Sequence, residues 1–128
     1  MRQEKGETRW LAESTDGGNS WTNLRTGVVV TPVACAIERF SPGSGASPYL
    51  LWTGPKGPKR KELLLRTSLD GGKTFSKGST ISSDLAAYSE IAILKDNSVG
   101  ILWERGTAES YQFITFTRVN QDWIKSAP

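Results

Sequence analysis

Short hydrophobic runs separated by turn-forming residues dominate the sequence. Apolar residues either alternate with polar ones or form brief continuous runs, and Gly, Pro, Asn, Asp and Ser stand between the runs. An apolar stripe with the 3.6-residue period of a helix is nearly absent, so the pattern predicts an all-β chain. We expect a hairpin turn at residues 95–98 and irregular loops at residues 41–48 and 54–59. The expected strands are residues 8–14, 28–30, 35–40, 49–52, 62–68, 89–94, 99–104 and 112–118.

An eight-residue signature occurs twice within this pattern. The first octapeptide is Ser14-Thr15-Asp16-Gly17-Gly18-Asn19-Ser20-Trp21. The second octapeptide is Ser68-Leu69-Asp70-Gly71-Gly72-Lys73-Thr74-Phe75, and equivalent positions lie 54 residues apart. A repeat of this length is typical of a four-stranded unit in a propeller or array rather than of a single core.

The octapeptide suits a tight turn between two strands. Its paired glycines can adopt the positive φ angles that hairpin turns require, and its Asp can accept hydrogen bonds from backbone N–H groups across the turn. The Ser or Thr at the seventh position can bond locally, and the aromatic residue can pack under the hairpin. The octapeptide resembles the Asp-box, or bacterial neuraminidase repeat, and we expect Asp16 and Asp70 to be structural rather than catalytic.

The strand count bears on the domain organisation. Grouped into fours, the strands give two blades and part of a third, whereas a closed propeller needs four or more blades because open blade edges expose unpaired backbone groups. No linker divides residues 1–128, which we take as one domain. We expect a piece of a larger propeller, with an oligomer or an open assembly as the alternatives.

Composition excludes several classes of function. The chain has 128 residues, a formal charge of +3 and an isoelectric point near 9.2. The sequence contains no His, which excludes His-based catalysis and argues against a metal site, and no cofactor is expected. Cys35 is the only cysteine and stands in an apolar stretch, so we expect a buried, inert thiol.

Charge and hydropathy bear on partners and location. The one dense basic cluster lies in a Pro/Gly-rich loop without flanking aromatic residues, so no nucleic-acid partner is expected, and an anionic small ligand suits the cluster equally well. The cluster comprises Lys56, Lys59, Arg60 and Lys61. No apolar run reaches membrane-spanning length, so no membrane partner is expected. Residues 1–6 are polar and show no signal peptide.

The sequence after the second octapeptide carries a more specific resemblance. It contains Ala86-Ala87-Tyr88-Ser89-Glu90-Ile91, then the segment 94–106 with Leu102-Trp103-Glu104, then Tyr111-Gln112-Phe113-Ile114-Thr115-Phe116. This order resembles the C-terminal end of the exo-α-sialidases, or neuraminidases, which tend to read A-Y-S-D-L, then D-G-x-x-G-x-L-[YF]-E, then Y-x-x-I-x-F. Together with the two octapeptides, the resemblance spans essentially the whole chain. It implies a partial β-propeller, with about two to three four-stranded blades of a six-bladed sialidase propeller.

The resemblance places the catalytic nucleophile of the family on Tyr88. Sialic acid carries a carboxylate at its anomeric carbon, so an Asp or Glu nucleophile would approach it against like charge. A neutral phenol activated by a neighbouring carboxylate avoids this repulsion, and sialidases are an exception to the two-carboxylate rule of glycosidases. An isolated Tyr at a strand start would ordinarily be a packing residue. Tyr111 is the alternative nucleophile, although we expect it to line the site or pack beside it.

Arginines are the expected binding groups for the substrate carboxylate. A planar guanidinium offers two parallel N–H donors to a carboxylate, and sialidases use three arginines together. The resemblance places the third of these on Arg60 and the second on Arg2, although the first residues of a chain usually fray. Arg66, nearer the second octapeptide, is expected to lie on a strand face.

Two acidic residues complete the comparison. Glu104 matches a family Glu that hydrogen-bonds the first arginine and orients it, although a Glu near a strand end is ordinarily solvated. Glu90 stands where the family commonly has Asp, and we expect this departure to be structural. If the resemblance holds, the Tyr88 hydroxyl and the Arg60 guanidinium should converge at one end of the propeller axis. The octapeptide turns should then lie elsewhere.

The catalytic set implied by the resemblance is incomplete in these residues. In the family, the first arginine, the Asp acid/base and the Glu that activates the nucleophile all lie upstream of the position of Arg2, and proton donation to the leaving group requires that acid. We therefore expect residues 1–128 to be the C-terminal part of a retaining exo-α-sialidase that cleaves terminal sialic acids, inactive as an isolated chain. The alternative is a non-catalytic Asp-box propeller fragment that binds glycans or acts as a scaffold, and sialyl transfer in place of hydrolysis also stays open.

The same resemblance implies the partners. We expect sialylated glycans and the missing N-terminal half of the propeller. Localisation is left open, since family members include secreted and periplasmic proteins.

Overall fold

Hairpin-joined antiparallel strands form nearly all of the regular structure in the computed structural model, which describes residues 6–43 and 47–126. The all-β prediction is therefore confirmed. The strands are β1 (Thr8–Glu13), β2 (Thr22–Val29), β3 (Ala36–Phe40), β4 (Tyr49–Pro55), β5 (Lys61–Ser68), β6 (Ser79–Ile93), β7 (Val99–Gly106) and β8 (Phe113–Val119), followed by helix α1 (Gln121–Lys125).

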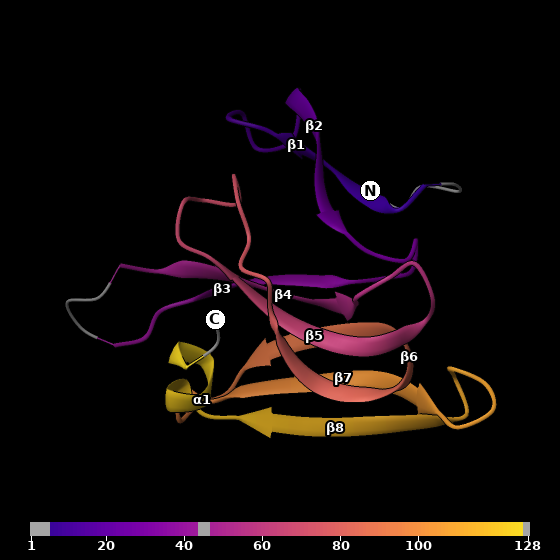
Figure 1. Ribbon diagram of the computed structural model, residues 1–128. Coiled ribbons are helices and arrows are strands. Elements are labelled where there is room, and N and C mark those ends of the chain that lie inside the picture. Colours follow the sequence, from indigo (N-terminus) through magenta and orange to yellow (C-terminus); the bar gives the residue numbers. More distant parts are fainter. Residues whose placement is uncertain (1–5, 44–46, 127–128) are drawn as a thin grey trace.

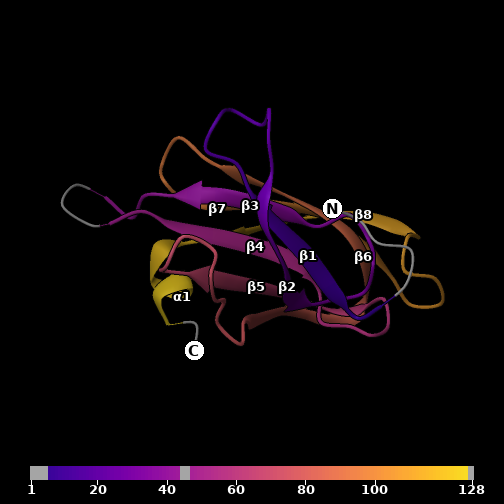
Figure 2. The same cartoon turned by 90° about the horizontal axis from the view of Figure 1, so that it is seen from above.

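The strands are arranged in two sheets. Strands β1 and β2 form a two-stranded sheet, and β3 to β8 form a six-stranded sheet in sequence order. The larger sheet curls, so that β7 and β8 lie below β3 to β5 in Figure 1, and β6 makes the bend. Seen from above, β1 and β2 lie across β3, β4 and β5 (Figure 2). The molecule is thus a stack of three layers.

Strand β6 belongs to two of these layers. Its first part pairs with β5, as in the pair Leu63↔Ser82, and its second part pairs with β7, as in Ser89↔Trp103. Leu85 is the shared position, since it stands opposite Lys61 on one side and Gly106 on the other. One four-stranded unit, from β3 to the start of β6, therefore continues without a loop into a three-stranded unit.

Two strands and the helix differ from the sequence-based prediction. Strand β2 begins at Thr22 rather than at residue 28, and β6 begins at Ser79 rather than at residue 89. The added residues are largely polar and exposed or half-buried, so their strand conformation comes from pairing with β1 and β5 and not from a hydrophobic pattern. The four-stranded unit runs from β3 to the start of β6, with β1 and β2 before it and the second part of β6, β7 and β8 after it.

Helix α1 has five residues and a conventional cap. The Asn120 side chain accepts a hydrogen bond from the Trp123 N–H (2.9 Å), and Ile124 is buried. A helix this short has no periodic stripe to detect in the sequence. In the described part of the chain no helix is long and apolar enough to cross a membrane.

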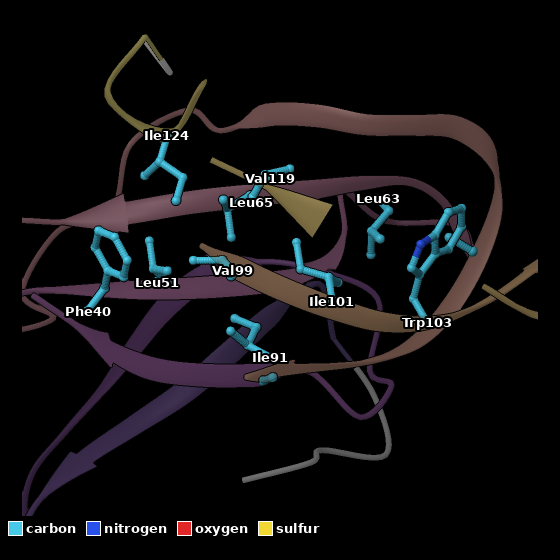
Figure 3. Packing of buried hydrophobic residues seen from close by; sticks show 12 residues of the cluster. Phe40, Leu51, Leu63, Leu65, Ile91, Val99, Ile101, Trp103, Val119 and Ile124 are labelled. Atoms are coloured by element: carbon cyan, nitrogen blue, oxygen red, sulfur yellow. The ribbon is translucent and has the colours of Figure 1, made fainter. Parts of the chain in front are cut away.

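The main hydrophobic core fills the inside of the curled sheet. It extends from Phe40 and Ile124 at one end to Trp103 at the other, with Leu51, Leu65 and Ile101 among the residues between them (Figure 3). Each such buried side chain contributes about 1.5–3 kcal/mol of transfer free energy, which makes this core the main stabilising element of the two larger units. The indole of Trp103 also donates a hydrogen bond to the Thr117 hydroxyl (3.0 Å).

A smaller cluster holds β1 and β2 against the larger sheet. It comprises Val28, Val30 and Trp52, and Cys35 and Phe75 pack against it. Cys35 is half-buried, and its burial raises the pKa of the thiol, which agrees with the expectation of an inert group. Arg9 lies beside it, buried, and donates to the Val33 carbonyl and to the Cys35 sulfur (3.3 Å).

Both octapeptides form the same hydrogen-bonded turn between two paired strands. In the first, the Ser20 N–H and hydroxyl donate to the Asp16 carboxylate (2.9 and 2.6 Å), and the Gly18 N–H donates to the Ser14 hydroxyl (2.8 Å). The second has the same bonds at the equivalent positions, with the same distances. The glycines have positive φ in both copies, between 71° and 93°. The expected turn chemistry is therefore confirmed.

The aromatic residues of the two octapeptides differ in their environment. Phe75 packs against the cluster of Val28, Val30 and Trp52, as expected, whereas Trp21 is 66% exposed. Trp21 still lies against its own turn, since a Cβ added to Gly18 would stand 3.7 Å from its ring, but it lacks the cover that Phe75 has. The reason is the layer order: the layer of β1 and β2 covers Phe75, and among the described residues no further layer lies beyond Trp21.

Candidate functional site

Tyr88 lies at a β-bulge in the middle of β6. Ala86 pairs with Arg105 and Ser89 pairs with Trp103, so three steps along β6 correspond to two along β7. Such a bulge interrupts the ladder and re-aims the side chain at its centre. Ala87 and Ser89 are buried, but Tyr88 is 36% exposed. The phenol is therefore accessible on a strand whose neighbouring residues are fixed.

Glu104 supports the bulge from strand β7. Its Oε2 accepts a hydrogen bond from the Tyr88 backbone N–H (3.2 Å). A residue inserted at a bulge is left out of the ladder, so a side-chain acceptor here satisfies the displaced amide. The structure thus brings Tyr88 and Glu104 together, through the tyrosine backbone.

The residue after Tyr88 is anchored in the interior. The Thr53 hydroxyl on β4 donates to the Ser89 hydroxyl (2.9 Å), and both residues are buried. The Ser89 N–H also donates to the Ala34 carbonyl (3.3 Å). These bonds fix the C-terminal side of the bulge, and the sequence analysis missed Thr53 although a polar residue in an apolar strand is a visible signal.

Arg60 lies immediately before β5, on a segment that contacts β6. The Ala86 N–H donates to the Arg60 carbonyl (3.0 Å), and the next pair is Lys61↔Leu85. The backbone of Arg60 is therefore adjacent to a residue two positions before Tyr88. Its side chain is partly exposed.

Arg66 occupies a different environment, as expected for a strand-face residue. Its guanidinium carbon lies 5.7 Å from the centre of the Trp52 ring, and its Nη1 donates to the Ser76 carbonyl (3.4 Å). Burial lowers the pKa of this guanidinium from its usual value. These contacts tie Arg66 to its own sheet.

Tyr111 lies on the loop between β7 and β8. The Gln112 side-chain oxygen organises this loop by accepting hydrogen bonds from the Thr107 and Ala108 N–H groups (2.8 and 2.9 Å). Tyr111 itself is 59% exposed. Of the other candidates, Arg2 lies outside the described residues.

The strand directions bring these positions to one end of the larger sheet. Arg60 precedes the start of β5, Glu104 lies near the end of β7, and Tyr111 precedes the start of β8. The second octapeptide begins at Ser68, at the opposite end of β5. Among the described residues, no group of three or more His, Cys, Asp or Glu side chains is arranged to hold a metal ion.

Comparison with known proteins gives a match at the level of structure. No protein-family model and no curated protein matches this chain. The crystal structure of the intramolecular trans-sialidase from Ruminococcus gnavus in complex with oseltamivir carboxylate matches 95% of the chain with a TM-score of 0.77 and 19% sequence identity. The chain has a sialidase-like fold. The predicted partial β-propeller is thereby confirmed, with its curled six-stranded sheet as two consecutive blade-like units.

The coverage and the sequence identity of this match determine which conclusions it supports. The chain spans 30% of the length of the trans-sialidase structure, so it corresponds to a part of that protein. At 19% identity, the match shows that the two proteins share a fold in this region.

Proposed function

We propose that this chain is the C-terminal part of a retaining exo-α-sialidase, with Tyr88 as nucleophile and Arg60 as one of the carboxylate-binding arginines. The observation that carries the proposal is the Tyr88 bulge. An accessible tyrosine stands on a β-bulge with a glutamate on its amide, and two positions earlier the Ala86 N–H is bonded to the Arg60 carbonyl, in a chain with a sialidase-like fold. Glu104 has the role of a positioning residue, and Tyr111 and Arg2 complete the proposed set.

The proposed chemistry follows from the substrate. The Tyr88 oxygen attacks the anomeric carbon of a sialoside and forms a sialyl–tyrosine bond, while its proton passes to a carboxylate base and the leaving group takes a proton from a separate acid. Water then attacks the same carbon from the face opposite Tyr88 and gives its proton to the deprotonated acid, while the carboxylate base returns its proton to the departing Tyr88 oxygen, which gives net retention. Arg60 binds the substrate carboxylate by a charge-assisted pair throughout. Base and acid are proposed to come from the rest of a longer propeller, so the isolated chain should show background hydrolysis only.

The second candidate function is non-catalytic. An Asp-box propeller fragment that binds glycans or acts as a scaffold would need both octapeptide turns, which are well formed here. It would have no need of an accessible phenol at a bulge. The two candidates therefore differ in what they predict for Tyr88 and Arg60.

Anion recognition by Arg60 tests the proposal directly. We expect N-acetylneuraminic acid to shift the amide resonances of Arg60 and Tyr88 in an NMR titration of the 128-residue protein, and its methyl ester, which lacks the charge, to shift them far less. Arg60→Lys keeps the charge but loses the bidentate fork, and should weaken binding about tenfold.

Arg118→Lys is the matched control, because it makes the same chemical change on β8, where Arg118 pairs with Asp96. It should bind like the wild type. Equal binding of acid and ester, or equal loss in both variants, would contradict the assignment of Arg60 and favour the non-catalytic candidate.

A further inference from the structure

We propose that Thr31 is a positioning residue for Arg60: its hydroxyl holds the Lys59 carbonyl and so sets the backbone that carries the arginine. The proposal rests on the proposed role of Arg60 in carboxylate binding. It adds a residue from the connection between β2 and β3, which lies in another layer and has no motif in the sequence.

The contact itself is short and buried. The Thr31 Oγ1 donates to the Lys59 carbonyl at 2.7 Å, and Thr31 is 7% exposed. Thr31 is fixed in turn, because its own carbonyl accepts a hydrogen bond from the Val33 N–H (2.7 Å). The flanking Val30 is fully buried in the smaller cluster. The donor is therefore held by structure on both sides.

The loop before Arg60 lies directly on this connection. A Cβ added to Gly57 would stand 2.9 Å from the Thr31 nitrogen and 3.1 Å from the Val30 carbonyl carbon. Gly57 also has a φ of 80°, which other residues adopt only with strain. The absence of a side chain at this position thus permits the close approach that brings Lys59 within reach of Thr31.

Two successive carbonyls on either side of the Arg60 Cα are bound to different layers. The Lys59 carbonyl accepts from the Thr31 hydroxyl and, within the loop, from the Lys61 N–H (2.9 Å), and the Arg60 carbonyl accepts from the Ala86 N–H (3.0 Å). Because peptide groups are planar, fixing both carbonyls fixes the two planes that meet at the Arg60 Cα. Only the side-chain torsions of Arg60 then remain free, and its base is fixed relative to the residues that precede Tyr88.

The charge of the loop makes such a restraint necessary. Lys59, Arg60 and Lys61 are consecutive cations, and like charges this close repel one another. Lys56 alone among the cluster has an ion pair in the described structure, with Glu62 (3.0 Å). The neutral Thr31 hydroxyl, bonded to the Lys59 carbonyl, holds the loop without neutralising the cations that an anionic ligand needs.

Thr31→Val tests the proposal, because it keeps the shape of the side chain and removes the hydroxyl. We expect the Ala86 amide to exchange with solvent at least tenfold faster, the Arg60 Nε–H resonance to shift, and the Kd for N-acetylneuraminic acid to rise about tenfold. Thr31→Ser restores a hydroxyl and should return all three to within about twofold of the wild type. That rescue separates a positioning hydroxyl from a packing role of the methyl group.

Thr117→Val is the control, because it also removes a threonine hydroxyl from a hydrogen bond, the one with the Trp103 indole, on strand β8, which does not pair with β5 or β6. It should leave the Ala86 and Arg60 signals unchanged. Unchanged Ala86 exchange and Arg60 resonance in Thr31→Val would overturn the proposal. A wild-type chain that fails to bind sialate contradicts the proposed function and the ligand part of this inference, whereas the exchange and resonance measurements still decide whether Thr31 positions Arg60.

Faster exchange at Ile101 in the main core would reveal that Thr31→Val unfolds the whole protein. A second variant keeps the proposal testable in that case. Gly57→Ala pushes the loop off Thr31 from the other side, and we expect it to shift the Arg60 resonance in the same way. If the Arg60 resonance keeps its position in Gly57→Ala, the proposal is wrong.

Discussion

At the scale of single residues, the Tyr88 bulge shows what sequence can and cannot give. The resemblance selected Tyr88 and Glu104, but it linked Glu104 to an arginine, whereas in the structure the carboxylate accepts the Tyr88 N–H. A bulge depends on the register between two strands, and nothing in the local sequence of either strand specifies that register. The hydrogen-bond partners of Thr53 and Thr31 could not be predicted for a similar reason, since each hydroxyl bonds a segment distant in the sequence.

The pairing predicts a specific effect of mutation at residue 104. In Glu104→Ala the Tyr88 amide loses its acceptor, so its proton resonance should move upfield and its hydrogen exchange should accelerate. The free energy of unfolding should fall by about 1 kcal/mol, the usual net value of one hydrogen bond. Glu104→Gln keeps an acceptor oxygen and should keep the Tyr88 resonance and exchange rate close to those of the wild type. Glu109→Ala, on the exposed β7–β8 loop, should change neither signal. A Tyr88 resonance that is the same in Glu104→Ala and in the wild type would contradict this account of the bulge.

At the scale of elements, the octapeptide turns derive their order from an ionised carboxylate. The hydroxyl and N–H of Ser20, with the Ser14 hydroxyl, hold the pKa of Asp16 at about 2, below its usual value near 4. The hydroxyl and N–H of Thr74 likewise lower the pKa of Asp70. A carboxyl whose pKa is lower in the folded state binds its proton more readily in the unfolded chain. Its contribution to stability is therefore complete above pH 4 and is lost as the pH falls toward 2.

This linkage gives a pH prediction for the second turn. The midpoint temperature of thermal unfolding should decrease in the wild type as the pH is lowered from 4 to 2. Asp70→Asn should lower the midpoint at pH 7 and flatten the decline below pH 4, because the ionised acceptor is gone. Thr74→Val removes one donor to the same carboxylate and should shift the decline to higher pH. The turn is not the source of the acid sensitivity if Asp70→Asn keeps the full wild-type slope.

Strands were predictable where burial imposes a pattern. Strands β4, β5 and β7 contain runs of buried residues, and the hydrophobic pattern located each of them. The first half of β6 reads Ser-Thr-Ile-Ser-Ser-Asp and is half-buried or exposed, so the sequence has no such pattern there. Its conformation is imposed by the neighbouring strand β5, a tertiary effect that propensity and periodicity do not record.

At the scale of the whole molecule, the two outer layers present apolar side chains to the outside. Trp21 and Leu24 are exposed on the layer of β1 and β2, and Leu102, Ile114 and Phe116 on the layer of β7 and β8. The middle layer, in contrast, is covered on both sides by the two clusters. This difference supports the proposal that the three layers belong to a longer series.

The layer order predicts unequal effects for the two equivalent aromatic residues. Phe75→Ala should lower the free energy of unfolding by about 1–3 kcal/mol, because Phe75 packs against Val28, Val30 and Trp52. Trp21→Ala should stay within about 0.5 kcal/mol of the wild type, as exposed positions usually do. Urea unfolding of the two variants measures the difference, and losses of equal size would contradict the layer assignment.

The continuity of β6 has a kinematic consequence. Because β6 passes from one unit to the next as a paired strand, any rotation of one unit against the other has to bend that strand and break ladder bonds on one of its sides. Leu85, the shared position, directly precedes Ala86, whose N–H is bonded to the Arg60 carbonyl, and the bulge of Tyr88 follows on the same strand. The two backbones therefore move as parts of one body, and their separation is set when the chain folds, before any ligand arrives.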